Sequence, residues 1–306
     1  GLSIVRSTIP SSVRCDAGSM THLGGDDHVV RLRDGRSLGF AQYGCADGVV
    51  VVNAHGGLVG RLDVGAARPF DDQAGIRLIS PDRPGIGLSD RLPGRTLLDW
   101  ADDIAELVDH LGVDRFYAMG WSMGGQYAAA LGYAMPSRVR RVAIIAGALP
   151  LIEPAVFAQL PLFDRAYTRL SQRAPWVARQ CFRTMALMAH TAPTLNGRLA
   201  AWGLGGADAG VLRAEGVDNF SAVSYEGLRR ASGVIDDYRA WALPWGFAPE
   251  DIDVPVDIWS GTEDPLVPSS WGDALAQRIP NATHYRRQGG HFVAHVHFAE
   301  LLETLR

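Results

Sequence analysis

Short runs of β-branched and other apolar residues alternate with helical patterns along most of this chain of 306 residues. In the first half, four such runs are expected to be buried strands, at 49–53, 76–80, 116–120 and 142–146. Helical spacing is clearest over 96–111, and Gly112 follows it as a stop signal. Because parallel strands need long crossover connections, this alternation predicts an α/β fold with a doubly wound, mostly parallel sheet.

Two features flank this alternating part of the chain. An antiparallel hairpin is expected before it, because the strand-like runs 29–32 and 38–43 surround Asp34-Gly35-Arg36. After Leu149 the strand pattern stops, and it resumes with a strand at 256–260, a helix near 269–278, a short strand near 284–287 and a last helix over 292–306. The sequence therefore predicts a polar N-terminal tail at 1–26, one core formed by 27–149 and 249–306, and a helical cap inserted at 150–248.

Composition excludes several kinds of chemistry. All 29 basic residues are arginine, so a Schiff base on lysine, a Walker phosphate loop and a Ser-Lys hydrolase are excluded. The net charge of −4, with no block of like charge, argues against nucleic acid and membrane partners. Cys15, Cys45 and Cys181 are widely spaced, which argues against a disulfide framework or a zinc site. We expect a cytoplasmic protein with a small-molecule substrate and without cofactor or metal; a homodimer stays open.

The sharpest motif is Gly120-Trp121-Ser122-Met123-Gly124, which lies between a predicted strand and a predicted helix. In a G-x-S-x-G turn the flanking glycines permit a strained serine, whose hydroxyl then projects from the sheet as a nucleophile. The segment Asn53-Ala-His55-Gly56-Gly57 also follows a strand and suits an oxyanion loop. The backbone N–H groups of Gly57 and Met123 are the expected oxyanion donors.

A serine nucleophile needs a base and a group that orients the base. Among nine histidines, His291 stands out because Gly289-Gly290-His291 places it in a tight loop after the last strand. Glu263 and Asp264 compete for the acid position, and the shorter Asp264, followed by proline, is favoured. The sequence order Ser122, Asp264, His291 is that of one known triad topology.

Other polar residues have weaker functional interpretations. His55 is interpreted mainly as a brace for its loop; His55 and Trp121 are also candidate substrate contacts, together with unspecified aromatic residues of the cap. His295 and His297 are two residues apart on a predicted helix and so face different directions, which argues against a metal pair.

Together these segments resemble the α/β-hydrolase superfamily over about 28–306. The resemblance rests on the loops around His55 and Asp264, the Ser122 turn, the Gly290-His291 pair and the stretch 82–90, which is interpreted as structural. It implies a capped serine hydrolase with the triad named above. Epoxide hydrolases and haloalkane dehalogenases of this superfamily use an aspartate where Ser122 stands, which disfavours both activities.

The expected activity is hydrolysis of a small, largely apolar carboxylic ester through an acyl-enzyme. A carbon–carbon bond hydrolase or a thioesterase with the same triad stays open, because Ser-Met-Gly-Gly occurs in several of these classes. A peptidase resembling proline iminopeptidases is a further alternative, although Gly120-Trp-Ser-Met-Gly124 departs from their usual motif. The least favoured alternative is a ligand-binding protein that retains the triad with little turnover.

Overall fold

Eight strands form one sheet in the part of the chain that this computed structural model describes, which is 26–63 and 75–305. They are β1 (Asp26–Arg31), β2 (Ser37–Gly44), β3 (Val49–Ala54), β4 (Ile76–Pro81), β5 (Phe116–Trp121), β6 (Val139–Ile145), β7 (Val256–Gly261) and β8 (Ala282–Arg287). Their spatial order is β1-β2-β4-β3-β5-β6-β7-β8. β2 is antiparallel to both β1 and β4, and the other neighbouring pairs are parallel. The predicted tail lies outside the described residues, except for Asp26.

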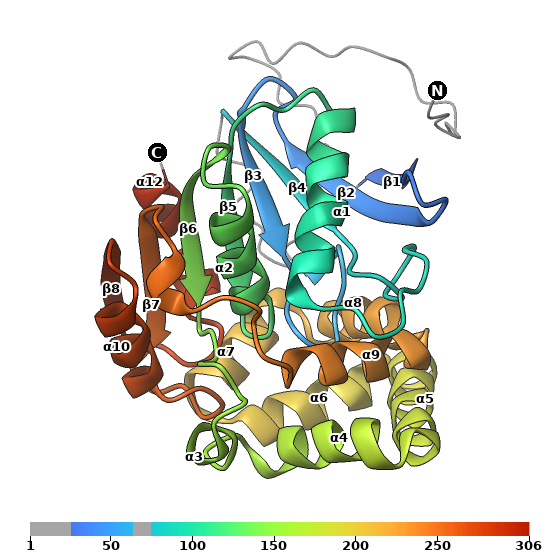
Figure 1. Cartoon of the computed structure of the whole chain (residues 1–306). Helices are drawn as coiled ribbons and strands as arrows, with labels where there is room; N and C mark the ends of the chain where they lie inside the picture. Colours follow the sequence, from blue (N-terminus) through green and yellow to red (C-terminus); the bar gives the residue numbers. More distant parts are fainter. Residues whose placement is uncertain (1–25, 64–74, 306) are drawn as a thin grey trace, which may run out of the picture.

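Helices cover both faces of this sheet, as Figure 1 shows. They are α1 (Leu97–His110), α2 (Gly124–Ala134), α10 (Ser269–Arg278), α11 (Val293–Val296) and α12 (Phe298–Thr304). Apolar side chains of α1, α2 and α10 pack on one face, and those of α11 and α12 pack on the other. The predicted α/β fold with a doubly wound, mostly parallel sheet is therefore confirmed.

The helix α1 begins and ends where the sequence signals place it. The Thr96 hydroxyl accepts a hydrogen bond from the Asp99 N–H at 3.2 Å, and the Asp99 carboxylate accepts one from the Thr96 N–H at 2.6 Å. This reciprocal capping satisfies two N–H groups that the helix leaves without partners. Gly112 follows the helix at φ 65°, a conformation that glycine adopts without steric cost.

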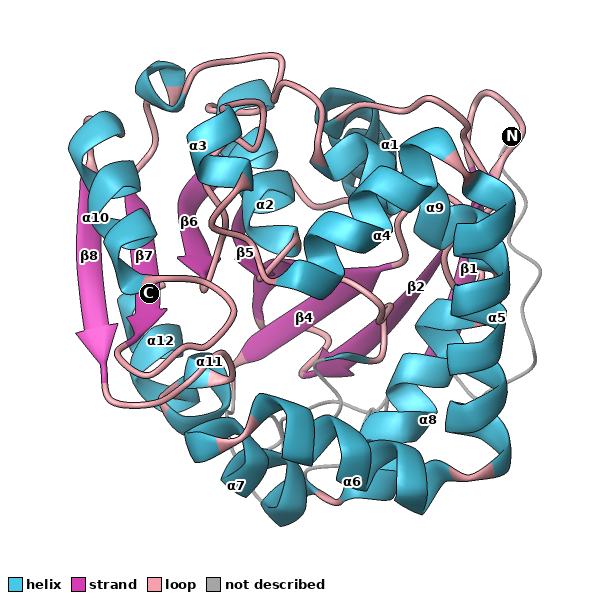
Figure 2. Ribbon diagram, turned by 90° about the horizontal axis from the view of Figure 1, so that it is seen from below, coloured by secondary structure: helices cyan, strands magenta, loops and turns pink. Residues whose placement is uncertain are grey.

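Seven α-helices lie between β6 and β7, in a segment whose residues are all described. They are α3 (Pro154–Phe157), α4 (Leu162–Arg173), α5 (Pro175–Thr191), α6 (Pro193–Leu204), α7 (Gly206–Glu215), α8 (Val217–Leu228) and α9 (Ala231–Trp241). We refer to this segment as the cap. Figure 2 shows α4 and α9 crossing near the ends of the central strands, with α5 to α8 at the periphery.

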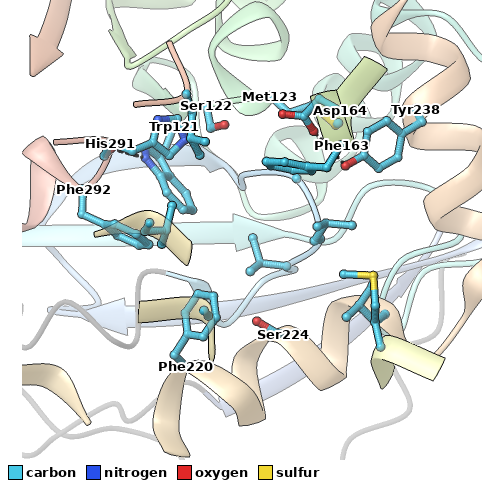
Figure 3. A pocket seen from close by; sticks show the side chains of 18 of the residues that line it. Trp121, Ser122, Met123, Phe163, Asp164, Phe220, Ser224, Tyr238, His291 and Phe292 are labelled. Atoms are coloured by element: carbon cyan, nitrogen blue, oxygen red, sulfur yellow. Dashed lines mark hydrogen bonds between the residues drawn. The ribbon is translucent and has the colours of Figure 1, made fainter. Parts of the chain in front are cut away.

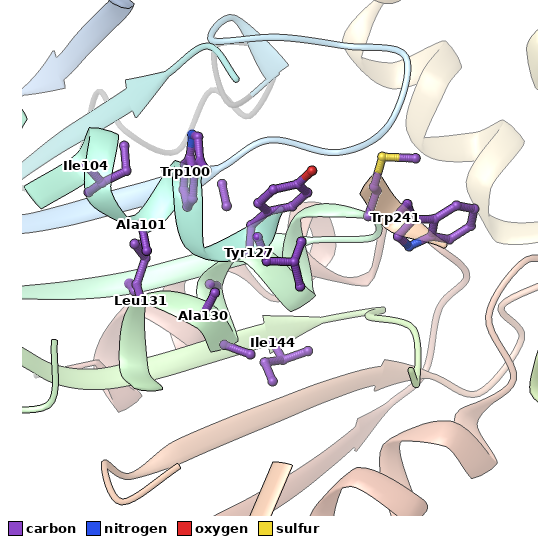
Figure 4. Close-up of a cluster of buried hydrophobic side chains, with 14 of the residues drawn as sticks. Trp100, Ala101, Ile104, Tyr127, Ala130, Leu131, Ile144 and Trp241 are labelled. Atoms are coloured by element: carbon purple, nitrogen blue, oxygen red, sulfur yellow. The ribbon is translucent and has the colours of Figure 1, made fainter. Parts of the chain in front are cut away.

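One hydrophobic cluster joins the cap to the core. In Figure 4, Ile104 and Trp100 of α1 and Tyr127 of α2 lie in a row that continues to Trp241 of α9, and Ile144 of β6 belongs to the same cluster. Each of these side chains is at least 95% buried, since the most exposed of them, Trp241, shows only 5% of its surface. The cap therefore shares its interior with the sheet and is not a separately packed unit.

The last predicted helix, over 292–306, is wrong as a single element. His297 has φ −112° and ψ 25°, outside the helical region, and separates α11 from α12. Its Nε2 lies 3.0 Å from the carbonyl oxygen of Gln288, so the imidazole bonds to the preceding loop. The break turns Phe298 into the core on the α12 side.

Among the described helices, none combines the length and the apolar character needed to cross a membrane.

Candidate active site

Ser122 occupies a sharp turn between β5 and α2. Its φ of 56° is in the left-handed region, which a non-glycine residue enters only at an energetic cost. The turn is fixed because the Ser122 N–H donates to the carbonyl of Ile145 at 2.8 Å. Glycine is required on both sides: a Cβ at Gly120 would collide with the carbonyl of Gly124, and a Cβ at Gly124 would collide with that of Ala54. This local geometry matches the nucleophile turn expected from the sequence.

Asp264 and His291 are hydrogen bonded to each other. The Asp264 Oδ2 lies 2.9 Å from His291 Nδ1, while its Oδ1 accepts the N–H groups of Leu266 and Val267 at 2.8 and 2.9 Å. Because a carboxylate only accepts, Nδ1 carries the proton and Nε2 is the basic nitrogen. Both side chains are buried, with 4% and 1% of the His291 and Asp264 surfaces exposed. The contact to His291 is made by Asp264 and not by its competitor Glu263.

A carboxylate of the cap holds the backbone of the histidine loop. Asp208 on α7 is buried and accepts the N–H groups of His291 and Phe292, each at 2.9 Å. A Cβ at Gly290 would collide with this carboxylate, so the close approach requires glycine. Burial alone would lower the pKa of His291, but Asp264, Asp208 and Asp164 together raise it above its ordinary value. The cap thus helps to position this histidine, and its two carboxylates add to the effect of Asp264 on the pKa.

Arg83 holds the loop after β3 by hydrogen bonds to two of its carbonyl groups. Its guanidinium donates to the carbonyl of His55 and, at 2.8 Å, to the carbonyl of Gly56. In a trans peptide the C=O and the following N–H point in opposite directions, and the described chain has no cis peptide. The Gly57 N–H therefore points away from Arg83, and Gly57 itself lines the cavity beside Ser122. This orientation suits the oxyanion donor expected at Gly57.

The second expected donor is the N–H of Met123. Met123 is the N-cap residue of α2, so its N–H lies where the helix dipole favours negative charge. Its side chain packs against Gly57, because a Cβ at Gly57 would lie 3.2 Å from the Met123 Cε. The two backbone groups thus border the same end of the cavity as Ser122.

Arg83 is held in turn by the cap. Asp237 on α9 accepts from Arg83 at 2.9 Å through both oxygens and also pairs with Arg95. All three side chains are buried. Burial alone would raise the pKa of Asp237, but the two guanidinium groups outweigh it and hold this pKa below its ordinary value. The loop after β3 is therefore tied to the cap by a buried, hydrogen-bonded ion pair.

His55 braces this loop and has no contact with the cavity. Its Nε2 accepts the Arg83 N–H at 3.1 Å and its Nδ1 lies 2.8 Å from the carbonyl oxygen of Gly56. Burial, with the nearby Arg83, lowers the pKa of His55 to about 3, so the ring is neutral. The expectation that His55 contacts substrate is wrong, because the ring is fully buried behind the loop. Trp121 does line the cavity, and its indole N–H donates to the His291 carbonyl at 2.9 Å.

The cavity that contains Ser122 and His291 has a volume of about 250 Å³ and lies between core and cap (Figure 3). Most of its wall is apolar. The core contributes Gly57, Leu58, Val59, Trp121, Ser122, Met123, Leu266, His291 and Phe292, and the cap contributes Phe163, Asp164, Met185, Asn196, Ala200, Leu204, Phe220, Ser224, Leu228, Tyr238 and Trp241. The cap aromatics left unspecified by the sequence are therefore Phe163, Phe220, Tyr238 and Trp241.

A second serine, histidine and aspartate are hydrogen bonded at the edge of the sheet. His284 Nε2 lies 3.0 Å from Ser260 Oγ, and His284 Nδ1 lies 3.0 Å from Asp273 Oδ1. This cluster lacks the other requirements of a nucleophilic site. A Cβ on Gly272 would lie 2.5 Å from the Ser260 hydroxyl, so the backbone of α10 covers it, and neither Ser260 nor His284 lines the cavity. The cluster is a structural bridge and serves as a control for Ser122.

The sequence alone did not reveal Arg83, Asp164, Asp208 and Asp237 as residues of the site. Arg83 lay in a stretch interpreted as structural, and the three acids lie in the cap, where periodicity carries no functional signal. Asp208 did have one signal, since it is the single charged residue in Gly203-Leu-Gly-Gly-Ala-Asp-Ala-Gly210. Among the described residues, no group of three or more His, Cys, Asp or Glu side chains has a metal-binding arrangement.

Two curated proteins illustrate the sequence similarity of this chain to known proteins. The chain matches the Magnesium-chelatase 30 kDa subunit of Rhodobacter capsulatus with 31% identity over 231 residues, covering 73% of this chain and 74% of that protein. A shorter match to Haloalkane dehalogenase 2 of Mycobacterium tuberculosis has 40% identity over 71 residues, which is 22% of this chain and only 25% of the dehalogenase.

The fold is also found in solved structures. An esterase from Thermogutta terrifontis superposes with a TM-score of 0.63 at 20% identity, over 93% of this chain and 98% of the other. The sequence pattern of the alpha/beta hydrolase fold family matches residues 49–298, which include every residue placed at the cavity above. This protein belongs to the alpha/beta hydrolase fold family.

Proposed function

We propose that this protein is a serine hydrolase that cleaves a small, largely apolar carboxylic ester through an acyl-enzyme. The observation that carries the proposal is that Ser122 and His291 line one cavity while Asp264 engages His291 Nδ1. A nucleophile, a base and an orienting acid are the groups that acyl transfer needs. The apolar wall supports a substrate whose acyl or alcohol part is hydrocarbon.

The reaction follows from these positions. His291 Nε2 takes the proton of Ser122 as the hydroxyl attacks the ester carbonyl, and the N–H groups of Gly57 and Met123 stabilise the oxyanion. His291 then protonates the leaving alcohol, and the acyl group stays on Ser122. Water, deprotonated by His291, releases the acid and restores the serine. Asp264 keeps the imidazole in its tautomer throughout.

The experiment compares Ser122, which lines the cavity together with His291, and Ser260, which is hydrogen bonded to His284 away from the cavity. In Ser122→Ala, hydrolysis of p-nitrophenyl butanoate should fall by roughly 10⁴-fold or more, and labelling by a fluorophosphonate should disappear. Ser260→Ala is the matched control, and we expect it to retain turnover within about twofold, since its hydroxyl is covered. Full turnover by the Ser122 variant would overturn the proposal. So would a wild-type protein that binds esters and turns over none of them.

A further inference from the structure

One acidic side chain lies in the largely apolar cavity. Asp164, in the first turn of α4, is the single carboxylate among the described residues that line it. The Tyr238 hydroxyl donates to Asp164 Oδ1 at 3.1 Å. Figure 3 shows the carboxylate directed into the cavity, toward the side on which Ser122 and His291 lie. The catalytic steps proposed above do not use this group.

This carboxylate has no cationic partner in the described part of the chain. Other cap carboxylates near the core have stronger partners: Asp236 and Asp237 pair with arginines of the core, Glu226 pairs with Arg61, and Asp208 accepts two backbone N–H groups. Asp164 accepts a hydrogen bond from the Tyr238 hydroxyl and interacts electrostatically with His291, but no arginine of 26–63 or 75–305 forms a salt bridge with it. A buried charge left without a partner is costly, so a ligand that brings a positive charge gains from binding here.

Aromatic rings surround the same part of the cavity. Phe163 precedes Asp164 on α4, and Tyr238 and Trp241 come from α9; all three line the cavity. Aromatic faces attract cations, and they also pack against alkyl groups on nitrogen. A carboxylate beside aromatic rings is the combination that recognises an alkylammonium group. A second carboxylate, a phosphate or a purely aliphatic chain would leave Asp164 uncompensated.

We propose that the substrate is an ester that carries an alkylammonium group, and that this group binds Asp164 and the adjacent aromatic rings. Asp164 is then a specificity-determining residue and takes no part in bond cleavage. This inference rests on the proposed function for its kinetic test, although the binding step itself does not require turnover.

The ionisation of Asp164 gives the preference a pH dependence. Burial raises the pKa of Asp164 to about 6, although the Tyr238 hydrogen bond and the nearby His291 act in the opposite direction. The ionisable groups that face it are His291 of the core, Tyr238 of α9 and Tyr167 of its own helix. Above pH 6 the carboxylate is charged and attracts a cation; below pH 6 it is protonated, and the attraction is lost.

Two esters of equal shape isolate the charge. We would compare 2-(dimethylamino)ethyl butanoate, which is cationic at pH 7, with 3-methylbutyl butanoate, in which carbon replaces the nitrogen. We expect kcat/KM at pH 7 to favour the cationic ester by about tenfold or more, and the ratio to fall toward one near pH 5. Because both esters need the same His291, its own titration largely cancels in the ratio.

Variants assign the preference to one residue. Asp164→Asn keeps the shape of the side chain, and we expect it to reduce the ratio to about one. Asp218→Asn, which removes an exposed carboxylate elsewhere on the cap, is the matched control and should leave the ratio unchanged. Equal kcat/KM values for the two esters in the wild type, or an unchanged ratio in Asp164→Asn, would overturn the inference.

Binding without turnover separates this inference from the proposed function. In calorimetry with Ser122→Ala, the cationic ester should bind more tightly than the neutral ester, and the added change Asp164→Asn should remove the difference. If neither ester is hydrolysed by the wild type but this binding difference is observed, the proposed function fails and the ammonium site stands. Equal binding of the two esters to Ser122→Ala refutes the ammonium site.

Discussion

Arg83 donates a hydrogen bond to the carbonyl of Gly56 at 2.8 Å and thereby fixes which way the next peptide N–H points. The same guanidinium is paired with Asp237 on the cap, so a residue of α9 controls the expected oxyanion donor through one intermediate side chain. Neither Arg83 nor Asp237 lines the cavity. Both are therefore positioning residues, and their effects should differ from those of residues that touch substrate.

Replacing Arg83 by lysine should lower kcat much more than it changes KM. Lysine keeps the positive charge, but three N–H groups on one nitrogen cannot reproduce the four hydrogen bonds that the forked guanidinium makes to Gly56, His55 and Asp237, so the Gly57 N–H loses its fixed direction. We expect kcat to fall by roughly 10²-fold, as for loss of one oxyanion donor. The control is Arg91→Lys, because Arg91 pairs with Asp236 but is 41% exposed and does not contact the loop. Equal effects of the two changes would mean that Arg83 acts only on stability.

Replacing Asp208 by asparagine should change the pH profile of the reaction. An amide has one acceptor oxygen, so one of the N–H groups of His291 and Phe292 loses its partner. Removal of the negative charge should lower the pKa of His291, which Asp208 helps to raise. Since His291 must be neutral to act as the base, the acidic limb of kcat/KM should move to lower pH, while kcat falls by about tenfold. An unmoved acidic limb would contradict this coupling.

Two glycine-to-alanine changes should have opposite effects on stability. At Gly124 a Cβ would collide with the carbonyl of Ala54, so Gly124→Ala should lower the free energy of unfolding by about 3 kcal/mol or more. At Gly210, inside α7, no atom lies within 4 Å of a Cβ, and Gly210→Ala should be neutral or stabilise by up to about 1 kcal/mol. Urea unfolding monitored by circular dichroism checks both, and a destabilised Gly210 variant would contradict this reading of α7.

His295 should make the protein less stable in acid. Burial, with the nearby His291, lowers the pKa of His295 to about 4, and its Nδ1 lacks a hydrogen-bond partner. The unfolded chain therefore binds this proton first: the contribution to stability is complete above pH 6.5 and is lost as the pH falls from 6.5 toward 4, by up to about 1.4 kcal/mol per pH unit.

The test is the unfolding free energy in urea between pH 7 and pH 4.5. His295→Phe should keep the fold, because Trp121 and Phe292 already surround the ring with aromatic contacts. It should also reduce the slope of the unfolding free energy against pH by the contribution of about one bound proton. His190→Phe, which replaces an exposed histidine of α5, is the control. The same pH dependence in the wild type and in His295→Phe would contradict the prediction.

The sequence by itself determined the sheet, its helices and the turns that present Ser122, Asp264 and His291. These features have local signals: a strand shows as a run of β-branched residues, and the Ser122 turn shows as a serine between two glycines, directly after a strand and before a helix. Because parallel strands end at the same edge, three strand-end loops could be expected to meet. The single helix predicted over 292–306 failed because the contact of His297 with Gln288 outweighs local helical propensity.

Only the tertiary structure decided how the cap acts on these loops. Asp164, Asp208 and Asp237 lie on three different helices. Asp208 and Asp237 contact core residues 83 and 154 positions away along the chain, and Asp164 contacts Tyr238 of another cap helix, 74 positions away. The periodicity of apolar residues does not predict such pairings, because the partners of a buried carboxylate are the donors that tertiary packing places beside it. Tertiary structure also distinguishes the two Ser-His-Asp groups. Ser122 lines the cavity, whereas the backbone of α10 covers Ser260, and the local sequence predicts neither property.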